Sequence, residues 1–417
     1  MSSLGFPIQK SGSRKKLPFT EKQKGPDLIL TQKTKMAKTN STAPSSRQQT
    51  YPFLLRQEPS SKWFQRLRSH LRKWFAVNKR DLPWRKNRDP YRIWLSEVML
   101  QQTQVVTVVD YFNRFTSQFP TIQQLAAAPE ETVLSLWEGL GYYRRARNMH
   151  AAAKIIATQF DGQFPNNLKE VMALPGIGRY SAGAILSIAF DQRHPILEGN
   201  TFRLHSRLLG VNADPRSKPV ENYLWEFSTR VLPQRRTGDF NQALMEIGSE
   251  ICKPKKPDCQ HCPLAKLCAA NALGIQSELP ISGKKTIYEP RNQALVIVHS
   301  HKQFLARKRT SEEWWSGLWD FFRIDTSSEN DATNRRTIEA ELQEQIGISI
   351  SLPEKPTKVI RHGVTKYRIR LACYSVAVDG PMPNSKKYSV VTQNELETLP
   401  LNITARQFLS CLPDQDC

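Results

Sequence analysis

The sequence lacks any uninterrupted apolar run of about 18 residues, the length at which a stretch becomes a candidate membrane-spanning helix. The first residues also lack the apolar core of a secretory signal. Cysteine is scarce, with seven in 417 residues, and reducing compartments keep such thiols unpaired. These absences predict a soluble, intracellular protein with no membrane partner. It would act in the cytoplasm or nucleoid of a bacterium, or in the nucleus or mitochondrion of a eukaryote.

Acidic residues are in short supply relative to basic ones. Lys and Arg number 60 against 38 Asp and Glu, so the formal net charge is +22. A surplus of this size indicates a polyanionic partner, because it raises the local concentration of anions around the molecule. Nucleic acid is the leading candidate, and an acidic membrane surface is the alternative.

The chain divides into four segments by composition. Residues 1–60 hold eleven basic and three acidic residues and no hydrophobic period, which predicts a disordered basic arm. Residues 61–275 show helical periodicity almost throughout. Residues 276–288 are polar and rich in turn formers, which indicates a linker. Residues 289–417 combine strand-like runs with one helical stretch, which predicts a smaller α+β domain.

The strongest chemical signal is a set of four cysteines. Cys252, Cys259, Cys262 and Cys268 follow the spacing C-x6-C-x2-C-x5-C. Four thiolates this close in sequence can converge on one metal centre, as iron–sulfur sites and structural zinc sites both require. Four unrelated buried cysteines are the alternative. The spacing alone does not separate zinc from an iron–sulfur cluster, because four sulfur ligands suit either.

A second signal is the stretch VMALPGIGRYSAGAILSIAF, residues 171–190. An apolar helix ends before Pro175, because proline prevents its continuation. Gly176 and Gly178 then permit a tight turn before a second helix, made of small residues, begins. Such a turn exposes backbone N–H groups at a helix N-terminus, where a phosphate can bind. In a basic protein this indicates a helix-hairpin-helix clamp on the DNA backbone, and the alternative is a helical hairpin without a ligand.

A third signal is the stretch WLSEVMLQQTQV, residues 94–105, in which Glu97 stands among apolar residues. Burial there would raise the pKa of Glu97, and a carboxylic acid kept protonated near neutrality can donate a proton to a leaving group. The amides of Gln101, Gln102 and Gln104 are able to hydrogen-bond base edges. An ordinary exposed Glu on an amphipathic helix remains the alternative.

Taken in order, SEVMLQQTQV, GLGYYRRARN, LPGIGRYSAGAI, ILEGN and the four cysteines resemble the adenine DNA glycosylases of the MutY type. These enzymes belong to the helix-hairpin-helix superfamily that includes endonuclease III. The resemblance covers residues 61–275 and implies a mainly α helix-hairpin-helix glycosylase fold with an iron–sulfur cluster loop. The fragments QALVIVHSHKQFLARKR and SGLWDFF further resemble a C-terminal α+β Nudix-like domain. The family also implies a monomer that acts on double-stranded DNA containing a mispaired adenine.

The resemblance implies roles for individual residues. It makes Glu97 the acid that protonates the departing adenine, Tyr180 the tyrosine beside the sugar, and Asn200 the asparagine that orients the catalytic carboxylates. It implies contacts to the lesion pair or its surroundings at Leu100, Gln101, Gln102, Thr103 and Tyr142. It makes Cys252, Cys259, Cys262 and Cys268 the ligands of a [4Fe-4S] cluster.

Position 180 separates two branches of the superfamily. In the bifunctional branch a lysine at this place forms a Schiff base with the sugar and cleaves the strand. Tyr180 has no amine, so we expect a monofunctional glycosylase of base excision repair, acting on adenine mispaired with 8-oxoguanine or guanine. Two carboxylates would act, one on the departing base and one on the positively charged sugar, after the base has left the duplex.

The sequence departs from the family in two places. Where the family has aspartate, the stretch HPILEGNTFR has Glu198, whose carboxylate stands one methylene further from the backbone. A misplacement of about 1 Å can cost roughly a hundredfold in rate. A lesion-binding homologue with little catalysis is therefore the alternative function. The family's lesion-reading loop of Phe-Ser-His type is replaced by Val364, Thr365 and Lys366, which keep only the hydroxyl, on Thr365.

Overall fold

The computed structural model describes residues 51–412, apart from 282–286, 329, 383–384 and 386. The predicted basic arm lies outside the described residues up to residue 50. Residues 51–60 are described and pack on the helical part of the chain, where Leu54 forms a bridge with Val211 and Glu58 accepts a hydrogen bond from Arg230. The packed chain thus begins before the boundary drawn at residue 60. None of the helices in the described ranges has the length and apolar character needed to cross a membrane.

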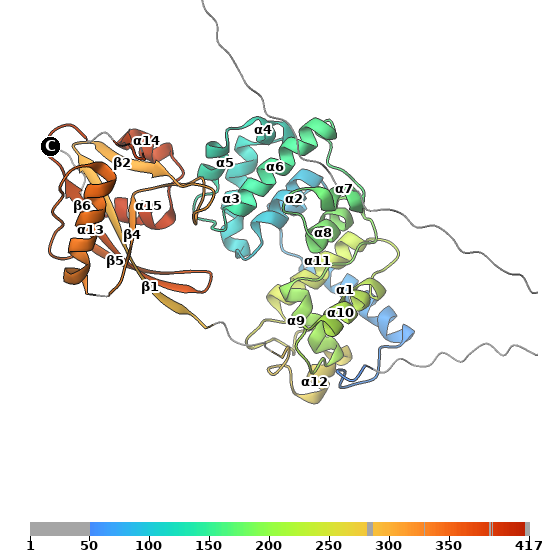
Figure 1. Cartoon of the computed structure of the whole chain (residues 1–417). Helices are drawn as coiled ribbons and strands as arrows, with labels where there is room; N and C mark the ends of the chain where they lie inside the picture. The colour runs from blue at the N-terminus through green and yellow to red at the C-terminus, as the bar shows by residue number, and fades with distance from the viewer. Residues whose placement is uncertain (1–50, 282–286, 329, 383–384, 386, 413–417) are drawn as a thin grey trace, which may run out of the picture. The chain divides into compact units, whose positions relative to one another are not determined.

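The first part of the described chain is helical (Figure 1). Its elements are α1 (Ser61–Asn78), η1 (Pro83–Arg85), α2 (Pro90–Met99), α3 (Val105–Gln118), α4 (Ile122–Ala127), α5 (Glu130–Leu136), α6 (Arg144–Gln159), α7 (Leu168–Ala173), α8 (Arg179–Phe190), α9 (Gly199–Leu209), α10 (Lys218–Arg230), α11 (Thr237–Glu250), η2 (Ala265–Leu267) and α12 (Ala269–Leu273). This order agrees with the helical periodicity of the sequence.

Local sequence explains where these helices begin. Helix α1 starts after Ser60, whose side chain accepts a hydrogen bond from the Trp63 backbone N–H. Helix α2 starts after Asp89, which caps it in the same way, and Pro90 occupies its first turn. Eight of the ten residues of α2 are buried, so this helix lies in the core rather than on the surface.

The helical part has two apolar cores, which lie on either side of helix α8. One core is formed by η1 and helices α2 to α8, and the other by α1, α9 to α11 and η2. Helix α8 packs against α2 and against α11. The contact with α11 requires a glycine, because a Cβ added at Gly238 of α11 would lie 2.4 Å from the Ser187 carbonyl oxygen of α8. The boundary between the two cores is where the candidate site lies.

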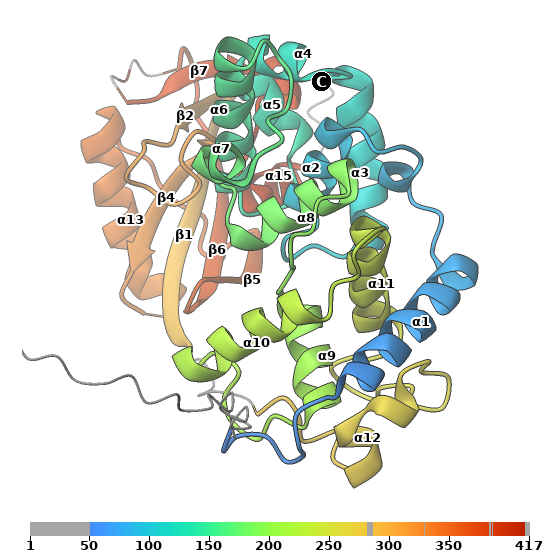
Figure 2. The ribbon, with the colours of Figure 1, turned by 90° about the vertical axis from the view of Figure 1, so that its right-hand side faces the viewer.

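The second part of the described chain is a sheet with helices on both faces (Figures 1 and 2). Its elements are β1 (Glu289–Ser300), β2 (Gln303–Lys308), β3 (Trp319–Asp320), β4 (Phe322–Thr326), α13 (Asp331–Ile346), β5 (Lys358–Val364), β6 (Tyr367–Ala377), β7 (Ser389–Thr392), α14 (Gln393–Thr398) and α15 (Ile403–Leu409). The main path of strands is β3-β2-β1-β6-β5, and β4 and β7 pair with β1 and β2. This arrangement confirms the predicted α+β domain.

Strand β1 shows why both faces are covered. It is fully buried over its last eight residues and pairs in parallel with β6, from Glu289 opposite Tyr367 to His299 opposite Ala377. Its residues 294, 296 and 298 join the apolar cluster under α13, whereas 295 and 297 join the cluster under α14 and α15. This alternation follows from the two-residue period of a strand.

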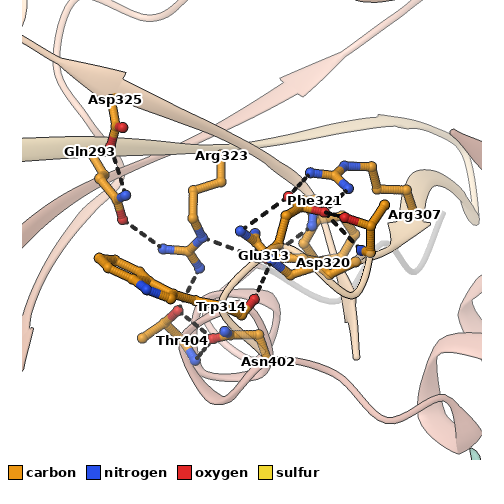
Figure 3. A network of polar contacts seen from close by, with 12 residues as sticks. Gln293, Arg307, Glu313, Trp314, Asp320, Phe321, Arg323, Asp325, Asn402 and Thr404 are labelled. Carbon is orange, nitrogen blue, oxygen red and sulfur yellow. Dashed lines mark hydrogen bonds and ion pairs between the residues drawn. The ribbon is translucent and has the colours of Figure 1, made fainter. Parts of the chain in front are cut away.

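A polar network ties helix α15 to this sheet (Figure 3). Asp320 has no exposed surface and is paired with the guanidinium groups of Arg309 at 2.7 Å and Arg323 at 3.0 Å. Arg323 also donates to the Thr404 hydroxyl at 2.8 Å. Two guanidinium groups therefore compensate the negative charge of the buried Asp320. Their hydrogen bonds to it offset the free-energy cost of removing this charge from water.

Candidate active site

A cavity of about 160 Å³ lies between helices α2, α8, α9 and α11. Six of the residues singled out in the sequence line it: Glu97, Leu100, Thr103, Tyr180, Glu198 and Asn200. They come from three stretches that are as much as a hundred residues apart in the chain. The fold therefore brings both candidate carboxylates to one enclosed space.

Glu97 and Tyr180 are in direct contact. Glu97 lies in the last turns of α2 with 6% of its surface exposed, and its Oε2 accepts a hydrogen bond of 2.7 Å from the Tyr180 hydroxyl. Burial raises the pKa of Glu97 to about 7; repulsion from Glu198 adds to the rise, whereas the Tyr180 hydrogen bond and Arg85 oppose it. Burial and the nearby carboxylates of Glu97 and Glu198 raise the pKa of Tyr180 well above its ordinary value. The Tyr180 hydroxyl therefore keeps its proton and is the donor in this hydrogen bond.

Glu198 is bound to the first turn of α9. As the N-cap residue, it accepts hydrogen bonds from the backbone N–H groups of Asn200 at 2.8 Å and Thr201 at 3.0 Å. Burial raises the pKa of Glu198, while these two N–H groups and the Arg203 guanidinium act to lower it. The extra methylene of glutamate is accommodated because the side chain folds back onto the helix end, where an anion is favoured.

Asn200 is held by a neighbour that the sequence did not single out. Arg203 donates to the Asn200 side-chain oxygen at 2.8 Å and to the backbone carbonyls of Gly248 and Cys252, each at 2.7 Å. Gly248 is needed for this approach, since a Cβ there would lie 2.6 Å from the Asn200 Cβ. One buried arginine thus joins the turn that carries Glu198 to the loop that carries the cysteines.

A third acid in the cavity was also missed. Glu246 of α11 is fully buried and bonds to Arg80 Nε at 2.8 Å and to Arg85 Nη2 at 2.8 Å. Burial alone would raise the pKa of Glu246, but the hydrogen bonds from Arg80 and Arg85 outweigh it and lower the pKa to about 2. Its signal in the sequence was the same as that of Glu97: an acid within an apolar run, Ala243 to Ile247.

Gln101, Gln102 and Tyr142 lie outside the cavity on two neighbouring loops. Gln102 and Tyr142 have positive φ angles of 60° and 48°, which are unusual for residues with a side chain. The side chain of Tyr142 is 61% exposed. Arg145 holds both loops, with Nη1 donating to the carbonyls of Val98, Met99 and Gln101, and Nη2 to those of Leu140 and Gly141. The arginine that shapes these loops was not predicted.

The turn between α7 and α8 has the glycines that were expected to form a hairpin. Gly176 has a φ of +79°, and a Cβ on it would lie 2.8 Å from the Asn148 Cβ. Gly178 is the N-cap of α8, with extended backbone and open space where a Cβ would stand. The fold therefore explains the glycine at 176 but requires none at 178, which leaves its bare backbone accessible to a ligand.

Thr365 stands at the tip of the hairpin between β5 and β6. It is exposed, has a φ of +51°, and its hydroxyl donates to the Val364 carbonyl at 2.8 Å. Its neighbour Lys366 pairs with Glu289 at 2.6 Å. These residues belong to the sheet domain and do not line the cavity that holds Glu97.

The four clustered cysteines are unpaired and line one small cavity of about 20 Å³, together with Arg207. Arg207 lies with Nη1 3.3 Å from the Cys252 sulfur, and its carbonyl oxygen is 3.3 Å from the Cys268 sulfur. In the described ranges, no three His, Cys, Asp or Glu side chains are gathered closely enough to bind a single metal ion. The donor set around this cavity is nonetheless that of a four-thiolate centre.

Two known families match the chain one after the other. The HhH-GPD superfamily of base excision DNA repair proteins matches residues 95–230, and the NUDIX domain matches residues 293–410. The first range contains Glu97, Tyr180 and Glu198 and ends before the cysteines. The second range begins within β1 and includes α13, α14 and α15.

Curated relatives include adenine DNA glycosylases. That of Buchnera aphidicola subsp. Schizaphis graminum is 41% identical over 254 residues, which make up 61% of this chain and 73% of the relative. That of Rattus norvegicus is 45% identical over 213 residues, which make up 49% of this chain and 41% of the longer rat protein. Among solved structures, a thermostable thymine-DNA glycosylase is 26% identical, with a TM-score of 0.47 over 51% of this chain and 98% of its own.

Proposed function

Because the chain belongs to the adenine DNA glycosylase family, whose domain is that of base excision DNA repair proteins, we propose that it is a monofunctional glycosylase. It hydrolyses the N-glycosidic bond of adenine mispaired with 8-oxoguanine or guanine. The observation that carries this proposal is the buried contact of Glu97 with Tyr180 in a cavity that Glu198 also lines. Most enzymes that hydrolyse glycosidic bonds use two carboxyl groups at one site.

Glu97 is the proposed general acid. With a pKa of about 7, a large fraction of its side chain is protonated near neutrality. The proton passes from the Glu97 carboxyl to a ring nitrogen of the extruded adenine, and the glycosidic bond breaks with its electron pair going to the base. The base then leaves as a neutral molecule, and the sugar is left with a positive charge at its anomeric carbon.

Glu198 is the proposed partner of that cation. The two backbone N–H groups and Arg203 favour its ionised form and act against the effect of burial. The carboxylate stabilises the positively charged sugar, or bonds to it transiently, until a water molecule adds to the anomeric carbon and gives one proton to the ionised Glu97, which leaves a hydroxyl on the sugar. Tyr180 contributes no amine, so no Schiff base forms and the strand stays intact.

The adenine must leave the base stack before Glu97 can reach it. We propose that the bare backbone at Gly178 binds a phosphate of the DNA, helped by the N-terminus of α8. The loops shaped by Arg145 would carry Leu100, Gln101, Gln102, Thr103 and Tyr142 to the mispair, and Thr365 would contact the opposite lesion. The family implies that the active form is a monomer.

The four cysteines are the proposed ligands of a [4Fe-4S] cluster. All four line one cavity, and none of them is in a disulfide, which supports this assignment. When bound, the cluster would cross-link residues 252–268 through four iron–thiolate bonds and take no part in hydrolysis. Purified protein is expected to be brown and to contain about four irons per chain. Colourless protein with stoichiometric zinc would contradict the assignment.

The experiment that tests the function is a single-turnover assay on three duplexes. They carry adenine opposite 8-oxoguanine, opposite guanine and opposite thymine, and alkali reveals the abasic sites. We expect product from the first two duplexes only, and no strand cleavage before alkali is added. Tight binding without alkali-labile product would mean that the chain recognises the lesion but does not excise adenine, and would overturn the proposal.

A further inference from the structure

A groove runs along the outer face of α1, apart from the cavity described above. It has a volume of about 590 Å³. We call it the α1 groove, and its lining consists of Gln65, Arg68, Ser69, Arg72, Phe75, Ala76, Lys79, Pro233, Arg235, Arg236, Asp239 and Phe240. Six of these residues lie on α1 and Lys79 follows it; they recur at helical spacing, so one helix face forms the whole length of the groove. From 65 to 79 this length is about 21 Å, which an extended segment of about six residues would span.

The α1 groove has an apolar floor and a basic rim. Phe75 and Phe240 line the groove although they are almost fully buried, at 6% and 5% exposure. Arg72 and Arg235 are exposed on the rim. Among the described residues no carboxylate pairs with either of them. The acid in the lining, Asp239, is already bound to Arg236 at 2.6 Å.

Arg68 adds a positive charge that is fixed in place. Its guanidinium donates to the Val231 carbonyl at 2.8 Å and to the Arg230 carbonyl at 2.7 Å. Burial, and then the nearby Arg193, lower the pKa of Arg68. The second cause shows that positive charge is crowded at this end of the groove. An acidic ligand would relieve that crowding.

The position of the α1 groove separates it from the DNA contacts proposed above. The first turn of α11, which lines the groove, is bound to Asp191 at the C-terminal end of α8, through the N–H groups of Arg236 and Gly238. The hairpin at Gly178 lies at the opposite end of the same 12-residue helix, about 18 Å away. Binding of the DNA backbone is mainly electrostatic, through its phosphates, and an apolar floor would not contribute to it.

We propose that the α1 groove binds an acidic segment of a partner protein, with carboxylates on its basic rim and an apolar side chain on its floor. Charge complementarity, groove length and the mixed lining all suit such a segment. Asp191 already occupies the N-terminus of α11, so the binding does not rely on that helix end. The inference does not depend on the glycosylase activity.

The test uses the full chain and fluorescence anisotropy with a labelled six-residue probe, four acidic residues around a Leu-Phe pair. The variant Arg72→Glu/Arg235→Glu reverses two rim charges. Its matched control, Arg66→Glu/Lys73→Glu, changes the net charge equally on exposed positions of α1 outside the groove. We expect the rim variant to weaken probe binding about tenfold and the control to change it by less than about twofold. Thermal unfolding midpoints verify that both variants are folded.

A second probe, with Ser in place of the Leu-Phe pair, tests the floor and should bind several-fold more weakly to the unaltered protein. If the rim and control variants lost equal affinity for the probe, the probe would be attracted by the net charge of the protein and not by the groove. That result would overturn the proposal. So would a loss of affinity for fully paired duplex DNA in the rim variant alone, since the occupant would then be the DNA backbone. A dimer that dissociates only in the rim variant would identify a second copy of this chain instead.

Discussion

Glu97 and Glu246 line one cavity from two different helices and show how far the surroundings can separate the pKa values of two residues of the same type. Both are buried, at 6% and 1% exposure, on helices α2 and α11. Glu97 on the α2 side accepts a hydrogen bond from one neutral donor, the Tyr180 hydroxyl of α8, and burial raises its pKa to about 7. On the α11 side burial acts in the same direction on Glu246, but two guanidinium groups outweigh it, and its pKa falls to about 2.

The difference in pKa implies different roles for Glu97 and Glu246. A carboxyl group that titrates near neutrality can give up a proton during a reaction, whereas a carboxylate held by two cations stays charged throughout. The sides also interact, because Arg85 bonds to Glu246 and acts to lower the pKa of Glu97. The α11 side therefore sets part of the electrostatic environment in which Glu97 works.

The largest effect is expected when the α2 side loses its acid. Glu97→Gln should lower the single-turnover rate of adenine excision about a thousandfold, within the range that general acid catalysis contributes. The amide can still accept the Tyr180 hydrogen bond, so the urea unfolding midpoint should be unchanged or higher. A variant that kept a rate within tenfold of the unaltered protein would remove Glu97 from the role of acid.

The next largest effect is expected on stability, from the α11 side. Glu246→Gln leaves Arg80 and Arg85 without their charged partner and should cost about 3 kcal/mol of unfolding free energy in urea at neutral pH. Because the pKa of Glu246 is depressed when folded, its stabilisation is present above the unfolded value of about 4.3. The stabilisation is lost as pH falls toward about 2.

Glu250 provides the matched control for that measurement. It also pairs with Arg80, at 2.7 Å, but its side chain is 44% exposed. Glu250→Gln should cost less than about 1 kcal/mol, as exposed ion pairs do. Equal losses for the two variants would mean that the buried contact of Glu246 is not what stabilises the α11 side.

A smaller effect is expected from Glu198→Asp. Both carboxylate oxygens of Glu198 already accept backbone hydrogen bonds, so the shorter side chain gains no contact and draws its charge back from the cavity. We expect the rate to fall between about tenfold and a hundredfold. A higher rate of adenine excision in the variant would mean instead that glutamate at position 198 lowers the rate of the unaltered protein.

The smallest effect concerns pH. The rate should decline as pH rises through about 7, because the acid form of Glu97 is lost there. The Tyr180 hydrogen bond favours the ionised form of Glu97, so Tyr180→Phe should move this decline to higher pH. A shift to lower pH would show that Tyr180 stabilises the protonated acid, contrary to our assignment of donor and acceptor.

Particular residues show how much was predictable. Glu97, Tyr180, Glu198 and Asn200 were identified from short motifs, and the structure brings all four to one cavity. Arg80, Glu246, Arg145 and Arg203 were not identified, although each makes several buried contacts there or on the loops nearby. Their partners are distant in the chain, 166 residues in the case of Arg80 and Glu246, or are backbone carbonyls that no motif marks.

Local features of the sequence specify the helical and α+β halves of the chain, the hairpin glycines and the cysteine spacing. These features depend on local backbone preferences and short periods, which a few neighbouring residues specify. Tertiary packing establishes which buried glutamate titrates near neutrality, how Glu198 fits its turn, and that a basic groove lies along α1. Those outcomes depend on which charges and N–H groups meet in space, and solvent exclusion at that meeting point sets their strength.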